Sequence, residues 1–321
     1  MSTNKDVVLG IDIGGTFTKL GIVDKNGTLY YEDSVPTDAF ENPNDFVEVI
    51  YTRVEEFTSS SELTFTLKGV GVGAPNGNNY TGNIEFAPNL QWKGVVPLAS
   101  ILSEKFALPA ELTNDANAAA IGEMIFGAAQ NMTNFLMITL GTGLGSGLVV
   151  NGDLVYGHDG FAGELGHVCV VEDGRLCGCG KKGCLETYVS ATGIKRTVFE
   201  LLSNDTSDSV FRTLSFNDVE ARMISEAAEN GDPIAKKAFK LTGKMLGKSL
   251  ANTVAHISPQ AIFLFGGLAL AGKWIFDPTK KAMEENLLEI FKGKIKILPS
   301  ALLEKNIAVL GAAALIFKSL T

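Results

Sequence analysis

Residues 7–16, VVLGIDIGGT, decide the fold, because an apolar strand in this stretch runs directly into a glycine turn. Residues 18–23 (TKLGIV) predict a second strand, and Asn26-Gly27 predicts a tight turn before a third strand at residues 28–31. Asn-Gly between two apolar runs is the strongest short-range signal for a hairpin. The first thirty residues therefore predict a small antiparallel unit closed at one end by glycines.

The same order returns in the middle of the chain. Residues 135–140 (FLMITL) predict a strand, residues 141–143 (GTG) its turn, residues 147–150 the next strand, and Asn151-Gly152 another hairpin. Two unrelated hairpins would also explain these segments taken singly. The repeated order favours a duplicated fold instead. Its two glycine tips would face each other across a cleft and offer backbone N–H groups to phosphate.

A third glycine site follows a buried strand at residues 261–265 (AIFLF), where Gly266-Gly267 would let a flat ligand lie on the backbone. Neither a G-x-x-x-x-G-K-[S/T] loop nor a G-x-G-x-x-G motif that opens a helix is present. The three sites together resemble the nucleotide motifs of the actin-like ATPase superfamily. That resemblance implies ATP contacts at Asp12, Gly14, Gly15, Thr16, Lys19, Gly141, Thr142, Gly143, Gly266 and Gly267.

The resemblance also implies a fold class. We expect an α/β, two-lobed actin-like ATPase (ribonuclease H-like) fold, with duplicated mixed β-sheets flanked by helices and a central cleft. The smaller lobe is predicted at residues 1–117 plus 307–321, and the larger at residues 118–306. Asp12 is expected to orient Mg²⁺ through water, while Lys19 either touches a phosphate or faces solvent.

Composition limits the partners. The net charge of −9 argues against a general nucleic-acid binder. No apolar run approaches the roughly 18 residues of a membrane span, and the N-terminus does not predict a signal peptide. We therefore expect a cytoplasmic protein, in which the 4 cysteines indicate metal binding or catalysis before disulfides.

Residues 164–186 carry the densest chemistry in the sequence. His167, Cys177, Cys179 and Cys184 follow the order H-x9-C-x-C-x4-C, which supplies a complete tetrahedral zinc set. Because the set is closed, the predicted zinc is structural. Buried free cysteines and a redox pair are the alternatives. Cys169 is interpreted as a core residue of an apolar strand, although it could replace one ligand.

This segment resembles the ROK family of sugar kinases and sugar-responsive repressors. The family's signature is a Glu-x-Gly-His run followed by Cys-x-Cys-Gly-x-x-Gly-Cys-x-Glu, found here at residues 164–167 and 177–186. With the nucleotide motifs, the resemblance runs from Asp12 to about Ala313. It implies an ATP-dependent hexose kinase, with Mg²⁺, a structural Zn²⁺ and a homodimer.

Residues 111–120 (ELTNDANAAA) predict a strand, a polar turn and an alanine-rich helix. Asp115 could be a helix N-cap, a position that Asp favours. The stretch also resembles the family's Asn-Asp catalytic turn, which implies that Asp115 is the base. Near a helix N-terminus its carboxylate is expected to stay ionised.

The resemblance implies sugar contacts at Asn89, Asn114, Asp115, Glu164, His167 and Glu186. His167 would then serve both the zinc and the sugar. Residues 73–77 (GAPNG) and 86–90 (FAPNL) resemble two sugar-side loops of the family. The first departs from the pattern, because Asn76 stands where a glycine is usual.

Three functions compete. A kinase acting on the 6-hydroxyl of glucose is favoured, with N-acetylmannosamine, N-acetylglucosamine, fructose or allose as alternative substrates. A sugar-responsive regulator without catalysis would need an N-terminal helix-turn-helix, for which Asp12 leaves no room in this sequence. A chaperone-type or filament ATPase would give residues 164–186 no role.

Overall fold

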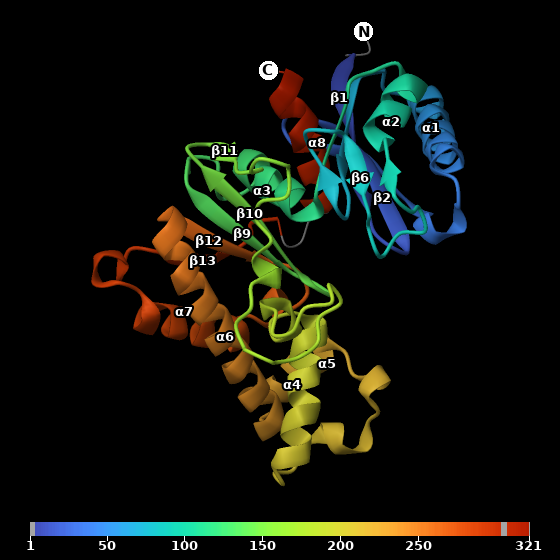
Figure 1. Ribbon diagram of the computed structural model, residues 1–321. Helices are drawn as coiled ribbons and strands as arrows, with labels where there is room; N and C mark the ends of the chain where they lie inside the picture. The colour runs from blue at the N-terminus through green and yellow to red at the C-terminus, as the bar shows by residue number, and fades with distance from the viewer. Residues whose placement is uncertain (1–3, 303–306, 321) are drawn as a thin grey trace. The chain divides into compact units, whose positions relative to one another are not determined.

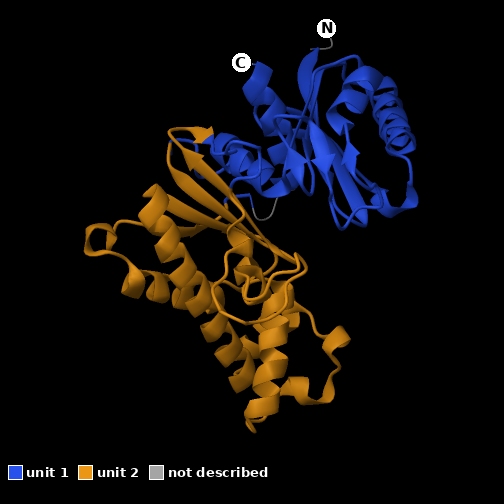
Figure 2. Cartoon of the chain, in the orientation of Figure 1, with its two compact units in different colours: residues 1–132, 154–162, 301–321 blue, residues 133–153, 163–300 orange. Residues whose placement is uncertain are grey.

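The computed structural model describes residues 4–302 and 307–320, and Figure 1 shows their arrangement. The chain forms two compact units, coloured separately in Figure 2. Unit 1 comprises residues 1–132, 154–162 and 301–321, and unit 2 comprises residues 133–153 and 163–300.

Unit 1 is built on a five-stranded sheet in the order β3-β2-β1-β4-β8. Strands β1 (Lys5–Ile13), β2 (Phe17–Asp24) and β3 (Leu29–Pro36) are antiparallel neighbours, and β4 (Phe65–Gly73) and β8 (Ala110–Thr113) continue the sheet in parallel. Both hairpins predicted in the first thirty residues are confirmed. Each follows an apolar strand and turns at glycine or Asn-Gly.

Helices cover both faces of this sheet (Figure 1). Helices α1 (Pro43–Ser60) and α2 (Leu98–Phe106) lie on one side, and α8 (Ile307–Leu320) lies on the other. The α1 side is lined by large apolar residues such as Phe46 and Ile50, both fully buried. A small three-stranded sheet, β5 (Gly77–Asn78), β6 (Asn83–Glu85) and β7 (Val95–Val96), carries the loops around residues 74–94.

Helix α8 packs so closely on the sheet that the backbones of the helix and the strands are in contact. A Cβ atom at Gly71 would lie 1.8 Å from the carbonyl oxygen of Ala312, and one at Gly10 would lie 2.3 Å from that of Val309. Helix α3 (Asp115–Phe126) joins this layer, because a Cβ at Gly311 would lie 2.2 Å from the oxygen of Ala118. The C-terminal residues of the described chain therefore pack on the sheet of unit 1 as helix α8.

Unit 2 repeats the same sheet. Its order is β11-β10-β9-β12-β13, again with three antiparallel strands followed by two in parallel. The strands are β9 (Phe135–Leu140), β10 (Leu144–Val150), β11 (Asp153–Leu154), β12 (Ala261–Phe265) and β13 (Lys296–Pro299). The identical order confirms the duplicated fold predicted from the two glycine hairpins.

Four helices complete unit 2: α4 (Ala191–Asn204), α5 (Ala221–Glu229), α6 (Pro233–Ile257) and α7 (Lys273–Asn286). Helices α6 and α7 approach closely at two glycines. A Cβ at Gly243 would lie 2.6 Å from Cγ of Pro278, and one at Gly247 would lie 2.4 Å from the oxygen of Thr279. None of the helices within residues 4–302 and 307–320 combines the length and hydropathy that a membrane crossing requires.

Compact unit 1 includes residues 118–126 of α3 and residues 154–162, which the predicted lobe boundaries (1–117 plus 307–321, and 118–306) assign to the larger lobe. The packing of Gly311 on Ala118 explains why α3 groups with α8. The segment around residues 303–306, where the predicted boundary falls, lies outside the described residues. The lobe boundaries themselves stay a prediction.

The contact between α8 and the sheet can be tested with Gly71→Ala. The new methyl group would overlap the Ala312 carbonyl, so one of the two backbones must move. We expect a loss of about 2–4 kcal/mol in the free energy of unfolding, measured by urea denaturation. Gly267→Ala is the control, because no atom lies within 4 Å of a Cβ there. Equal stability of both variants would contradict this packing.

Candidate functional site

The first glycine turn closes the β1–β2 hairpin of unit 1. The Gly14 N–H donates to the carbonyl oxygen of Phe17 at 3.0 Å. Asp12 and Lys19 lie directly opposite each other in the register of the two strands. A Cβ at Gly15 would lie 2.8 Å from the oxygen of Asn89. Glycine at position 15 therefore lets the loop that carries Asn89 pack directly on the turn.

Asp115 is the first residue of α3, and the preceding residue, Asn114, is the helix N-cap. The Asn114 side chain accepts a hydrogen bond from the Asn117 N–H at 2.7 Å, as an N-cap residue does. One carboxylate oxygen of Asp115 accepts the Ala116 N–H at 2.9 Å. Because Asn114 performs the capping, Asp115 is available for another role.

Asp12 and Asp115 form a pair of like charges in unit 1. Both lie against Gly73, whose Cβ would be 3.9 Å from Asp12 Oδ1 and 3.8 Å from the Asp115 Cα. Burial and the charge of Asp115 raise the pKa of Asp12 to about 7, against the opposing charge of Lys19. The two carboxyl groups therefore resist carrying full charge together.

The pKa of Asp115 differs in direction from what its position at a helix N-terminus suggests. Its side chain reaches solvent, yet the protein crowded around it reduces its hydration, and this desolvation raises its pKa. The hydrogen bond from Ala116 acts in the opposite direction and is the weaker effect. Asp115 is thus a more basic carboxylate than an ordinary surface aspartate.

The second glycine turn closes the β9–β10 hairpin of unit 2, where the Gly141 N–H donates to the Gly143 oxygen at 3.1 Å. Thr142 is exposed at its tip. Gly266 adopts a φ of 99°, and its Cβ would lie 2.6 Å from the oxygen of Leu140. The predicted Gly266-Gly267 site therefore lies beside the end of β9, next to Gly141. No atom lies within 4 Å of a Cβ at Gly267, which leaves its backbone open.

Glu186 connects this turn to the cysteine-rich segment. One of its carboxylate oxygens, Oε2, accepts the Leu144 N–H at 3.0 Å. The other, Oε1, lies 3.5 Å from the Cys177 sulfur. A Cβ at Gly143 would lie 2.3 Å from Oε2, so a side chain at position 143 would expel this carboxylate.

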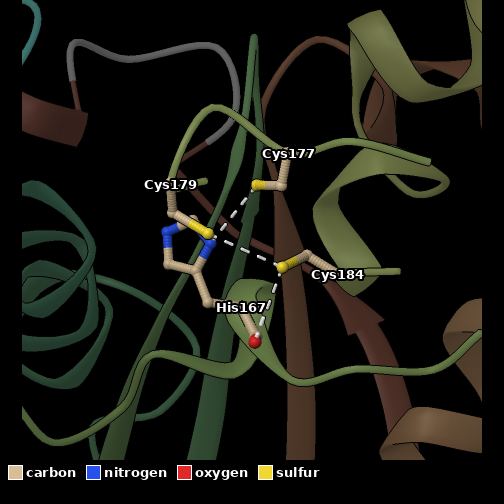
Figure 3. Close-up of side chains that lie close together, drawn as sticks. All are labelled: His167, Cys177, Cys179 and Cys184. Atoms are coloured by element: carbon tan, nitrogen blue, oxygen red, sulfur yellow. Dashed lines mark hydrogen bonds between the residues drawn. The ribbon is translucent and has the colours of Figure 1, made fainter. Parts of the chain in front are cut away.

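The predicted metal ligands His167, Cys177, Cys179 and Cys184 converge (Figure 3). Their four ligand atoms all lie within 4.8 Å of one another. The sulfurs of Cys179 and Cys184 are 3.7 Å apart, and the Cys177 sulfur is 3.7 Å from His167 Nδ1. Tetrahedral zinc with bonds of about 2.3 Å to sulfur separates its ligands by roughly this much. The donor set and its spacing fit a structural zinc ion.

The two ring nitrogens of His167 face different partners. Nδ1 faces the Cys177 sulfur, whereas Nε2 lies 3.8 Å from Oε2 of Glu164. A metal bound at Nδ1 would leave the proton on Nε2 and fix the ring direction. The imidazole could then donate a hydrogen bond from Nε2 on the side where Glu164 lies.

The chain turns tightly to bring the cysteines together. The Cys177 N–H donates to the Lys181 oxygen at 2.9 Å, and Gly183 adopts a φ of 75° in close contact with Val171. Burial raises the pKa of the Cys177 thiol to about 12. A thiolate at this position therefore depends on a bound cation.

Arg175 is a supporting residue that the sequence did not reveal. Its guanidinium donates to the Thr187 oxygen at 2.6 Å and to Glu200 of α4 at 2.6 Å, and it lies 4.4 Å from the ring centre of Tyr188. It anchors the cysteine segment to α4. The one sequence feature that pointed to this role is its position, two residues before Cys177, the first cysteine of the predicted metal set.

Cys169 corrects one prediction. It was interpreted as a core residue of an apolar strand, but it is exposed and lies outside the metal cluster. Its segment makes only an isolated bridge, between Cys169 and Cys184. Here apolar neighbours led to the wrong expectation, because residues 168–171 run along the surface and Val168 is 48% exposed.

The structure divides the predicted residues between the two units. Unit 1 holds Asp12, Gly14, Gly15, Thr16, Lys19, Asn89, Asn114 and Asp115. Unit 2 holds Gly141, Thr142, Gly143, Glu164, His167, Cys177, Cys179, Cys184, Glu186, Gly266 and Gly267.

The duplicated sheets and their glycine turns define an actin-like ATPase fold. Residues 8–319 match the ROK family. The chain therefore belongs to the ROK family.

Known relatives span nearly the whole chain. A glucokinase of Streptomyces coelicolor is 35% identical over 288 residues, with 88% of each chain covered. The crystal structure of a ROK family glucokinase from Streptomyces griseus, in complex with glucose and AMPPNP, has a TM-score of 0.80 and 33% identity, covering 96% of this chain and 98% of that one. A xylose repressor of Caldicellulosiruptor bescii is 26% identical over 326 residues, covering 100% of this chain and 81% of the repressor.

The raised pKa of Asp12 predicts a dependence of stability on pH. Between its unfolded pKa near 4 and its folded pKa of about 7, the folded state binds the proton more tightly, so stability falls as pH rises. Asp12→Asn should therefore stabilise the ligand-free protein at pH 8, by on the order of 1–3 kcal/mol, and leave it unchanged near pH 3.5.

Thermal unfolding of the Asp12→Asn variant across this pH range provides the measurement. Asp6→Asn, on the same strand and exposed, is the matched control and should show no such trend. A loss of stability at pH 8 in the Asp12 variant would refute the like-charge explanation.

The metal site makes a separate prediction. Elemental analysis of the purified protein should find one zinc per chain, and Cys179→Ser should lose it because three donors no longer close the tetrahedron. Cys169→Ser is the matched control, since that thiol lies outside the cluster. Zinc retained at full occupancy by Cys179→Ser would exclude this ligand set.

Proposed function

We propose that this protein is a glucokinase, which transfers the γ-phosphoryl group of ATP to the 6-hydroxyl of glucose. The wider class, an ATP-dependent sugar kinase, rests on membership of the ROK family and on glucokinase relatives that span nearly the whole chain. The observation that carries the proposal is the position of His167, between the cluster of three thiols and the carboxylate of Glu164.

Asp115 serves as the base in this proposal. Phosphoryl transfer needs an aligned hydroxyl, a carboxylate that accepts its proton, and donors that stabilise charge on the phosphates. The raised pKa of Asp115 makes it a better proton acceptor than a fully hydrated aspartate. Its position at the start of α3, with Asn114 as the cap, fixes its backbone for this role.

The glycine turns serve the nucleotide. Backbone groups of Gly14, Gly15, residues 141–143 and Gly266-Gly267 would face the nucleotide. Among them, Gly141 and Gly267 leave open the space that a Cβ would take, so a ligand can approach their backbone closely. Mg²⁺ bound with ATP would supply positive charge to the phosphates. Asp12, with its pKa raised to about 7, would be held ionised by that charge and by Lys19 across the hairpin.

The sugar is proposed to be contacted by directed polar side chains. Glu164, His167 Nε2 and Glu186 belong to unit 2, and Asn89, Asn114 and Asp115 belong to unit 1. Zinc would act at a distance, by holding the His167 ring so that Nε2 presents a donor. The known complex of the Streptomyces griseus relative with glucose and AMPPNP supports glucose as the acceptor.

The second candidate is a sugar-responsive regulator, which is favoured by the similarity to a xylose repressor over the whole chain. Within the kinase class, N-acetylmannosamine, N-acetylglucosamine and fructose remain alternative acceptors, because the same carboxylates and amides would serve them.

A coupled assay of ADP release against these sugars distinguishes the candidates. We expect glucose to give the highest kcat/KM of the panel. Strong turnover of an N-acetylated sugar with poor turnover of glucose would replace the proposed acceptor. Binding of a sugar without any ADP release would favour the regulator.

The role of Asp115 is tested by Asp115→Ala. Loss of the proton acceptor should reduce kcat by at least about 10³ while calorimetric glucose binding is largely retained. Asp45→Ala is the matched control, because Asp45 lies in the first turn of α1 as Asp115 lies in that of α3. Retained activity in the Asp115 variant would reduce that residue to a contributor to helix stability.

A further inference from the structure

Asn76 has a backbone conformation that few non-glycine residues adopt. Its φ is 51°, in the left-handed region, where asparagine is tolerated better than most residues and glycine best. This conformation explains why asparagine can replace the glycine that is usual at this position in the ROK family. The backbone conformation alone does not account for the hydrogen bonds that the Asn76 side chain makes.

The Asn76 side chain joins two loops of unit 1. Its Nδ2 donates to the carbonyl oxygen of Glu85 at 3.0 Å and to that of Phe86 at 3.4 Å. Its own backbone oxygen accepts the Glu85 N–H at 3.1 Å. Asn76 therefore extends the pairing of β5 with β6 by one residue, at the point where the chain leaves β6. Glycine could keep the backbone bond but would lose both side-chain bonds.

Phe86, at the far end of this bridge, is itself strained. It has a φ of 53° and a side chain that is 71% exposed, so packing of its ring does not hold the conformation. Two contacts do hold it: the bond from Asn76 to its oxygen, and the bond from its own N–H to the Gly94 oxygen at 2.7 Å. Three residues further on is Asn89, the exposed residue proposed to contact the sugar.

The other side of Asn76 is anchored beside the catalytic turn. The Ala74 N–H donates to the Thr113 oxygen at 2.9 Å, and the Gly77 N–H donates to the Ala74 oxygen at 3.1 Å. A Cβ at Gly77 would lie 2.4 Å from the same Thr113 oxygen. Thr113 directly precedes Asn114 and Asp115. Asn76 thus stands between the segment that carries the base and the loop that carries Asn89.

We propose that Asn76 is a positioning residue, whose side-chain amide sets the place of Asn89 relative to Asp115 and so determines affinity for the sugar. This inference rests on the proposed function. Asn76 acts through the 86–90 loop, since its side-chain Nδ2 donates to the carbonyl oxygens of Glu85 and Phe86.

The test compares Asn76→Gly, Asn89→Ala and the double variant by steady-state kinetics. Glycine suits the left-handed backbone, so the fold should survive while the amide is lost. Because two neutral hydrogen bonds contribute modestly, we expect KM for glucose to rise about three- to tenfold. The kcat should stay within about twofold and KM for ATP should not change, as for lost ground-state binding.

The double variant separates positioning from a general effect on folding. If Asn76 acts through Asn89, Asn76→Gly should add nothing to Asn89→Ala. Asn151→Gly is the matched control, because Asn151 has a φ of 55° in the second hairpin of unit 2. An unchanged KM for glucose in Asn76→Gly, a parallel rise in KM for ATP, or full additivity in the double variant would each overturn the proposal.

Hydrogen–deuterium exchange without ligands gives a readout that does not depend on the identity of the substrate. Asn76→Gly should speed exchange in residues 86–94 and leave residues 135–150 unchanged. Unaltered exchange in residues 86–94 would overturn the inference even if glucose is the substrate. If glucose is not turned over by the unaltered protein, the glucokinase proposal fails instead, and the same variants are compared on the sugar that is turned over.

Discussion

The carboxylate of Glu186 occupies the space that a side chain at position 143 would fill. Its oxygens reach the Leu144 N–H of the glycine turn and approach the Cys177 sulfur of the metal cluster. A single residue therefore ties the turn proposed to hold phosphate to the segment proposed to hold the sugar and zinc. The missing Cβ of Gly143 is the condition for this connection, since even an alanine would displace the carboxylate.

A second constraint operates in unit 1 and reduces its stability. Asp12 and Asp115 are brought together against Gly73, and each loses hydration there. The like charges weaken the ligand-free fold near neutral pH. The same pair creates a place where a cation with ATP would be bound strongly and where one carboxylate is basic enough to accept a proton. Stability is reduced at the residues that the proposed reaction requires.

Much of this architecture could be predicted from the sequence because its signals are local. The apolar strand before Gly14 and the Asn-Gly turns each specify a hairpin within a few residues, and their repetition predicted the second sheet. The spacing of His167 and the three cysteines predicted a cluster that the structure confirms.

The features that escaped prediction depend on residues distant in the sequence. The raised pKa of Asp115 follows from the protein packed around it, whereas its helix position alone suggested an ordinary ionised carboxylate. Cys169 is exposed because its segment follows the surface beside Cys184. The use of Asn76 could not be foreseen because its partners, Glu85 and Phe86, lie at the end of β6 and just beyond it, across a short hairpin.

The central claim is the proposed transfer of the γ-phosphoryl group of ATP to the 6-hydroxyl of glucose. The most direct test is the proton-coupled ³¹P NMR spectrum of the product formed from ATP and glucose. Transfer to the 6-hydroxyl attaches phosphorus to a CH₂–O group, so the account predicts a triplet. A doublet, as from phosphorylation of a ring hydroxyl, or hydrolysis to inorganic phosphate alone, would contradict it.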